Sequence, residues 1–135
     1  MEKIRDVDRW RSADYLKRAE ECLSSMERDF GDGKWGSCVI LAIHAAISAA
    51  DALCIHALGK RSASENHRDD ITLFQSIDVN DEEIRKAVIR LAELLKIKTD
   101  AEYGERPQSK SDAERAKLNA ERFVSFVKKR LPQAR

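Results

Sequence analysis

A nearly unbroken apolar stretch from Cys38 to Leu58 constrains the fold of this chain more than any other feature. A helix rises about 1.5 Å per residue, so a helix over this stretch would be long enough to cross a membrane. Against a membrane span stand polar side chains that are costly in lipid, namely His44, Ser48, Asp51 and His56. The stretch therefore predicts the central helix of a bundle, ended by Gly59 and covered by neighbouring helices.

His44, Ser48 and Asp51 are spaced so that they share one face of this helix. Such a stripe is either a satisfied, half-buried polar seam or the floor of a site. An unpaired carboxylate among alanines and leucines would be destabilising. We therefore expect Asp51 to have hydrogen-bond partners or to face a groove.

Helices are also predicted on both sides of the central one. Apolar residues recur at three- and four-residue steps from Trp10 to Phe30, which predicts an amphipathic helix with these residues inward. Ser12 is its expected N-cap, and Gly31-Asp32-Gly33 ends the pattern. After the central helix, a short helix is expected over about His67–Ile77.

Two capping boxes mark the starts of the last two long helices. Asn80 with Glu83 is expected to open the first of them, whose pattern fades after Leu95. Ser111 with Glu114 is expected to open the second. Each cap satisfies backbone N–H groups that a helix start leaves without partners.

Composition agrees with one helical domain. Charged residues make up 36% of the chain, with five glycines and two prolines, a profile typical of helical proteins. We predict an all-α fold, an up-and-down helical bundle of four long helices plus one short helix. It forms a single domain over residues 1–135, with its core at about 10–131. The N-terminus lacks the apolar run of a signal peptide, and Cys22, Cys38 and Cys54 are expected to be buried reduced thiols, so a cytoplasmic location is expected.

Arg61 and His67 stand in the polar segment that follows the central helix. On one continuous helix, residues six apart point about 120° from each other, so a loop must bring this pair together. Gly59 and a helix cap at Ser64 or Asn66 would supply that loop and place His67 in the first turn of the short helix. A neutral histidine beside such an anion-binding helix start suits a base that deprotonates a ribose 2′-hydroxyl. The guanidinium of Arg61 suits charge that develops on a phosphate.

The same pair also has a purely structural interpretation, a solvated arginine and a helix-capping histidine on a surface turn. The net charge of +1 indicates that any contact with nucleic acid would use a local patch. The Lys128-Lys129-Arg130 run is either a solvated face with favourable helix-dipole placement or an RNA-backbone contact. No cluster of carboxylates, histidines or cysteines has metal-ligand spacing, so we expect neither a metal nor another cofactor.

The order of these parts resembles the HEPN family (higher eukaryotes and prokaryotes nucleotide-binding). The similarity covers nearly all of residues 10–131. It rests on Ala19-Glu20, the segment 42–53 of the central helix, Arg61 and His67 with five residues between them, the segment 103–107, and Ala120-Glu121-Arg122-Phe123-Val124.

The resemblance implies a helical bundle that dimerises and, in active members, a metal-independent endoribonuclease site contributed by both protomers. By position, Arg61 would bind phosphate and His67 would be the catalytic histidine. Supporting or phosphate-binding roles are expected for Ser64, Asn66, Tyr103 and Arg106, with structural packing as the alternative role of Tyr103. The first interpretation is therefore a toxin or defence effector that acts on RNA and has an antitoxin or another protein as its partner.

The alternative is a non-catalytic HEPN interaction or nucleotide-binding module that works with a partner protein. Many toxin members have Asn or Asp next to the arginine and a tyrosine two residues after the histidine. Here Ser62 follows Arg61, and Arg68-Asp69 follows His67.

Overall fold

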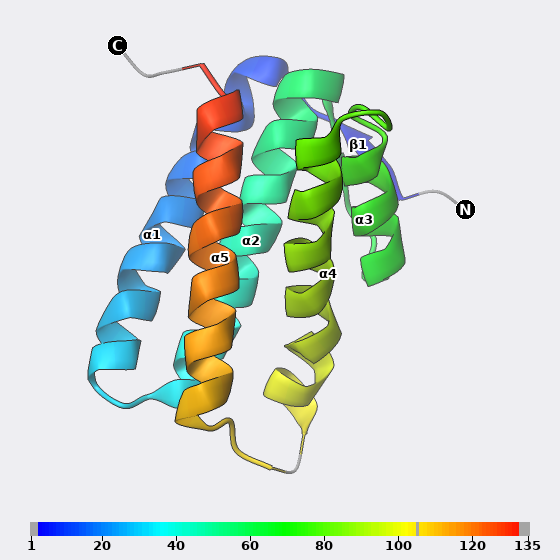
Figure 1. Ribbon diagram of the computed structural model, residues 1–135. Coiled ribbons are helices and arrows are strands. Elements are labelled where there is room, and N and C mark those ends of the chain that lie inside the picture. The colour runs from blue at the N-terminus through cyan, green and yellow to red at the C-terminus, as the bar shows by residue number, and fades with distance from the viewer. Residues whose placement is uncertain (1–2, 105, 133–135) are drawn as a thin grey trace.

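The structure is a computed structural model that describes residues 3–104 and 106–132, and only the backbone of residues 99–103. Figure 1 shows that the four long helices of this described part run up and down beside one another. They are α1 (Ser12–Gly31), α2 (Trp35–Leu58), α4 (Glu82–Tyr103) and α5 (Lys110–Arg130). A short helix, α3 (His67–Gln75), packs against α4. The predicted all-α bundle of four long helices and one short helix is confirmed.

Helix α2 is the core of the bundle. It packs against α1, α4 and α5, and its many alanines allow these helices to approach closely. It is apolar and long enough to cross a membrane, but 72% of its most apolar 18-residue segment is buried inside the protein. Gly59 ends the helix in the left-handed conformation at φ +68°, with its N–H donating to the Ile55 carbonyl at 2.8 Å. These observations confirm the prediction of a central helix capped by Gly59.

Two short strands, which the sequence did not indicate, tie the N-terminal segment to the end of α2. Strand β1 (Ile4–Asp6) pairs antiparallel with β2 (Lys60–Ser62), so that Arg5 lies opposite Arg61. Arg61 therefore lies in a strand and not in a loop. This pairing fixes the backbone of the segment that carries it.

The start of α1 differs from its prediction. A 3₁₀ turn, η1 (Arg9–Arg11), runs directly into α1, so Ser12 is a helical residue, buried to 8% exposure, and not an N-cap. A 3₁₀ turn has 3.0 residues per turn and not 3.6, which moves its side chains off the apolar stripe of the following helix. As a result, Trp10 is 70% exposed, and its predicted inward placement is wrong.

The starts of α4 and α5 also lie elsewhere than predicted. The Asp81 carboxylate, and not the Asn80 side chain, accepts the first N–H groups of α4, from Glu83 at 2.9 Å and Ile84 at 3.2 Å. The Asn80 N–H instead donates to Asp78 in the preceding turn. An ionised side chain is the better cap because it also meets the positive end of the helix dipole.

The capping box of α5 is formed by Ser109 and Asp112, and not by Ser111 and Glu114. The Ser109 hydroxyl accepts from the Asp112 N–H at 3.1 Å, and the Asp112 carboxylate accepts from the Ser109 N–H at 2.8 Å. Both the Ser109–Asp112 pair and the Ser111–Glu114 pair have the spacing of a capping box. The Ser109–Asp112 pair comes earlier in the sequence, so the helix it caps is longer.

Candidate functional site

Arg61 is a half-buried residue of β2 whose side chain contacts the backbone of Ser62 and the ring of Tyr15. Its Nη1 donates to the Ser62 carbonyl at 3.3 Å. Its Cζ lies 5.9 Å from the centre of the Tyr15 ring on α1. These contacts restrict the guanidinium to the side of β2 that faces the bundle.

His67 is the first residue of α3 and is half-buried. The Asn66 side chain caps this helix by accepting from the Arg68 N–H at 2.9 Å. The Ser64 hydroxyl accepts from the Asn66 N–H at 3.0 Å and donates to the Asp69 carboxylate at 2.7 Å. The predicted cap at Asn66 and the placement of His67 in the first turn are confirmed, and Ser64 and Asn66 hold the turn that leads to it.

Two carboxyl groups lie beside the segment that carries Arg61 and His67. Asp51 of α2 and Asp70 of α3 line one small cavity together with Ser62 of β2. Its volume of about 10 Å³ leaves room for about one water molecule. The rest of the lining is mostly apolar, from Ile47, Ala50, Cys54, Leu73, Leu91 and Leu95. Asp51, which was expected to have hydrogen-bond partners or to face a groove, lines this small cavity and not an open groove.

The charges of this region form one linked cluster. Burial raises the pKa of Asp51 to about 7, with Arg61 opposing the shift and Asp70 adding to it. Burial also raises the pKa of Asp70, opposed first by a hydrogen bond with Ser62 and then by His67. Arg61 thus lowers the pKa of Asp51, Asp70 raises it, and His67 lowers the pKa of Asp70. Each member of the motif therefore acts on one of the two half-buried acids that line the cavity, Arg61 on Asp51 and His67 on Asp70.

The polar stripe of α2 is not a continuous site floor. His44 is exposed and Ser48 is buried at 7% exposure, and neither lines the cavity. Of the three residues, Asp51 alone reaches it. The stripe therefore combines one surface residue, one buried hydroxyl and one member of the acidic pair.

The other predicted supporting residues are placed differently. Tyr103 ends α4, and its side chain lies outside the described residues. Arg106 is exposed in the connection between α4 and α5, which Figure 1 shows at the end of the bundle away from α3. Within one chain, Arg106 is therefore not brought to Arg61 and His67.

Two cations of the C-terminal run have acidic partners. Lys128 pairs with Glu20 at 3.2 Å, and Arg130 donates to both carboxylate oxygens of Asp81 at 2.7 and 3.1 Å. Among the residues that the structure describes, no three His, Cys, Asp or Glu side chains gather as a metal-binding group. The three cysteines are free thiols, with Cys38 and Cys54 buried and Cys22 half-buried.

A family model described as the HEPN domain matches residues 12–130, from the start of α1 to the end of α5. The chain belongs to the HEPN family. Its fold is also similar to the crystal structure of TT1696 from Thermus thermophilus, with a TM-score of 0.67 and 19% sequence identity. That similarity covers 90% of this chain and 98% of the other, and it shows a shared fold. Comparison with curated proteins found no match.

Membership of the HEPN family confirms the resemblance drawn from the sequence. In this HEPN domain, the Arg–x5–His segment spans β2 and the first residue of α3, just after the core helix. The family and the fold do not by themselves establish a reaction, which depends on the residues at the site.

Proposed function

We propose that this HEPN protein is a metal-independent endoribonuclease that acts as a toxin or defence effector, with Arg61 and His67 as its catalytic residues. One observation carries the proposal. Arg61 from β2 acts on Asp51 and His67 from α3 acts on Asp70, and these two half-buried carboxyl groups line one small cavity. Half-buried acids with raised pKa values that interact with a cation and a histidine are the kind of arrangement found at enzyme active sites.

The reaction proposed is attack of a ribose 2′-oxygen on the adjacent phosphorus. Neutral His67 accepts the 2′-hydroxyl proton, the bond to the 5′-oxygen breaks, and the products are a 2′,3′-cyclic phosphate and a 5′-hydroxyl. The Arg61 guanidinium stabilises the negative charge that builds on the non-bridging oxygens. The N-terminus of α3 adds N–H groups that favour an anion beside His67. Asp51 and Asp70 serve as positioning residues for Arg61 and His67.

A second copy of the chain would complete this chemistry. One protomer offers one base, but the departing 5′-oxygen also has to receive a proton. Across a two-fold axis, His67 of one protomer can act as the base while the partner's His67 acts as the acid. We therefore propose a homodimer with both motifs close to the axis.

Light scattering tests this assembly directly. We expect a mass of about twice the 15.4 kDa chain at micromolar concentration, and a concentration series to show whether the dimer dissociates on dilution. A monomer throughout the micromolar range would contradict the two-protomer site.

The activity itself is tested with purified wild-type protein and single-stranded RNA in excess EDTA. We expect cleavage that leaves 2′,3′-cyclic phosphate ends and that EDTA does not inhibit. Cleavage that depends on a divalent cation, or that leaves 3′-hydroxyl ends, would rule out this mechanism. The location proposed is the cytoplasm, which suits a protein with free thiols at Cys22, Cys38 and Cys54.

A non-catalytic interaction or nucleotide-binding module is the second candidate. It is favoured by the contacts of Arg61 with Tyr15 and the Ser62 carbonyl, which give the guanidinium a structural role within one chain. In that case the wild type would cleave no RNA, and its function would require a partner protein.

A further inference from the structure

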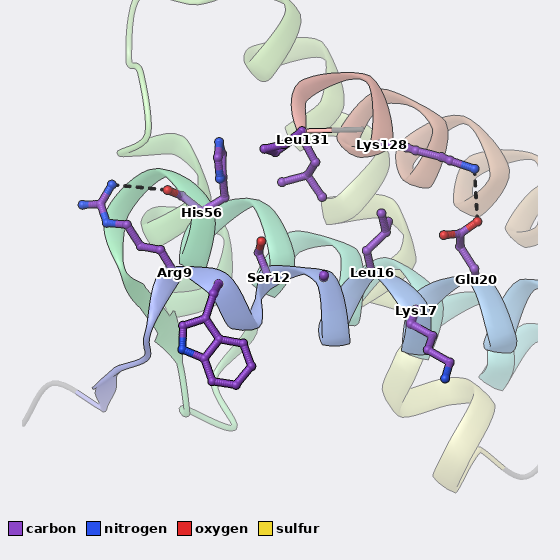
Figure 2. Close-up of a pocket in the computed structure, with 11 residues that line it drawn as sticks. Arg9, Ser12, Leu16, Lys17, Glu20, His56, Lys128 and Leu131 are labelled. Atoms are coloured by element: carbon purple, nitrogen blue, oxygen red, sulfur yellow. Dashed lines mark hydrogen bonds and ion pairs between the residues drawn. The ribbon is translucent and has the colours of Figure 1, made fainter. Parts of the chain in front are cut away.

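An open groove lies where the start of α1 meets the ends of α2 and α5 (Figure 2). Its volume is about 810 Å³, which is within the usual range for ligand sites of roughly 300–1,000 Å³. Its apolar lining comes from Ala13, Leu16, Leu131 and Pro132. Neither Arg61 nor His67 lines it, so it is separate from the candidate catalytic site.

Cationic side chains from three elements line this groove, namely Arg9 of η1, Lys17 of α1 and Lys128 of α5. Figure 2 shows Arg9 and His56 at one end and Lys17, Glu20 and Lys128 toward the other. Among the described lining residues, Glu20 is the one carboxylate, and Lys128 already pairs with it at 3.2 Å. The charge of the groove is therefore complementary to an anion, although the chain as a whole is nearly neutral.

Arg9 prepares one end of the groove for an anion. Its Nη1 donates to the carbonyls of His56 and Ala57, both at 3.3 Å, at the negative end of the α2 dipole. Without this contact, those carbonyls would repel a phosphate. A guanidinium has five N–H donors, which is more than these bonds use.

Trp10 adds an aromatic surface to the same groove. Its side chain lines the groove and is 70% exposed, and the Cζ of Arg11 lies 5.4 Å from its ring centre. An exposed indole among cations matches the way in which proteins hold single-stranded nucleic acid, by stacking a base and contacting the backbone. An acidic protein segment would satisfy the charges but would not require a stacking surface.

We propose that this groove binds a few nucleotides of single-stranded RNA that flank the bond to be cut, with a base stacked on Trp10 and phosphates on Arg9 and Lys17. The inference rests on the proposed ribonuclease function. Along η1 and α1, the segment from Arg9 to Glu20 extends roughly 17 Å, which is long enough for a few nucleotides. At its Arg9 end the chain continues into β1, whose partner strand β2 carries Arg61. RNA that leaves the groove at this end is therefore directed toward the strand that carries Arg61.

Binding can be measured without cleavage. The chain has two tryptophans, so Trp35→Phe leaves Trp10 as the only one, and His67→Ala in the same protein removes the proposed base. The probe is a short 2′-O-methyl oligouridylate, which has no 2′-hydroxyl to attack the phosphorus. We expect it to quench Trp10 fluorescence to saturation, with an affinity that falls as salt rises.

Groove variants of the full chain then locate the contact, with a fluorescently labelled copy of the same oligonucleotide followed by anisotropy. Trp10→Ala should weaken binding about tenfold, the usual loss for one stacked base, and Lys17→Glu should also weaken it. Ile89→Ala, at a 61% exposed position on α4, is the apolar control. Lys34→Glu makes the same charge change between α1 and α2, at the other end of the bundle from the groove. Neither control should alter the affinity.

Three results would overturn this assignment. They are unchanged affinity in both groove variants, an equal loss in Lys34→Glu, or quenching of Trp10 by polyglutamate but not by the oligonucleotide. The last would identify the groove as a docking surface for an acidic protein. Failure of the wild type to cleave RNA, with groove binding intact, would refute the ribonuclease and leave a single-stranded RNA-binding groove.

Discussion

His67→Ala is expected to reduce the cleavage of single-stranded RNA by about two to four orders of magnitude, the usual worth of a positioned acid–base group. The bundle should stay folded, because His67 lies at the start of α3 and outside the hydrophobic core. The measurement is the initial rate of formation of 2′,3′-cyclic phosphate ends in excess EDTA. Circular dichroism of each variant would confirm that its helicity is unchanged.

His44→Ala is the matched histidine control, because His44 is exposed on α2 and does not line the acidic cavity. Arg61→Lys should also impair cleavage, since a point charge does not reproduce the forked contact of a guanidinium with phosphate. Arg68→Lys, at an exposed position next to His67, should have no comparable effect. Undiminished cleavage in His67→Ala would exclude His67 as the base. Absence of cleavage by the wild type across many RNA substrates would favour the non-catalytic module.

The bundle could be predicted from local patterns, because each helix is defined by residues close together in the sequence. The apolar run of α2 and the left-handed cap at Gly59 are examples of such local signals. The pairing of β1 with β2 gave no signal, since three-residue strands are too short to show alternation and their partners lie far apart in the sequence. Trp10 was wrongly predicted to face the core because a 3₁₀ turn cannot be told from an α-helix by composition, although the two differ in the number of residues per turn.

The candidate site was predicted in part. Asp51 was recognisable as a carboxylate within an apolar helix, and the Asn66 cap identified the position of His67. Asp70 was missed, because an acid in the first turn of a helix already has a local explanation in the helix dipole. Its place beside Asp51 depends on how α3 packs against α2, which no local pattern encodes. The dimer stays a prediction for the same reason, since it depends on a surface of two chains.

Asp51→Asn is expected to stabilise the protein at pH 8 and to have little effect near pH 4. Burial raises the pKa of Asp51 from 3.8 to about 7 in the folded protein. Between these values the unfolded chain loses the Asp51 proton while the folded protein keeps it, so the free energy of unfolding falls as pH rises from about 4 to 7. Above pH 7 the loss is complete, and at 1.36 kcal/mol per pKa unit it amounts to about 4 kcal/mol. Asparagine has no charge to bury and should not show this loss.

Urea unfolding of wild type and variant at pH 4.5 and pH 8 measures the difference, in which titrations common to both proteins cancel. The groups that act on Asp51 are Arg61 from β2, Asp70 from α3 and Arg18 from α1, so Asp70→Asn should recover part of the same free energy. Glu65→Gln neutralises an exposed carboxylate in the nearby β2–α3 segment and is the matched control. Equal pH dependence in wild type and Asp51→Asn would show that Asp51 is not the buried acid described above. A gain in stability together with reduced RNA cleavage would show that the carboxyl is retained for its action on Arg61 and not for folding.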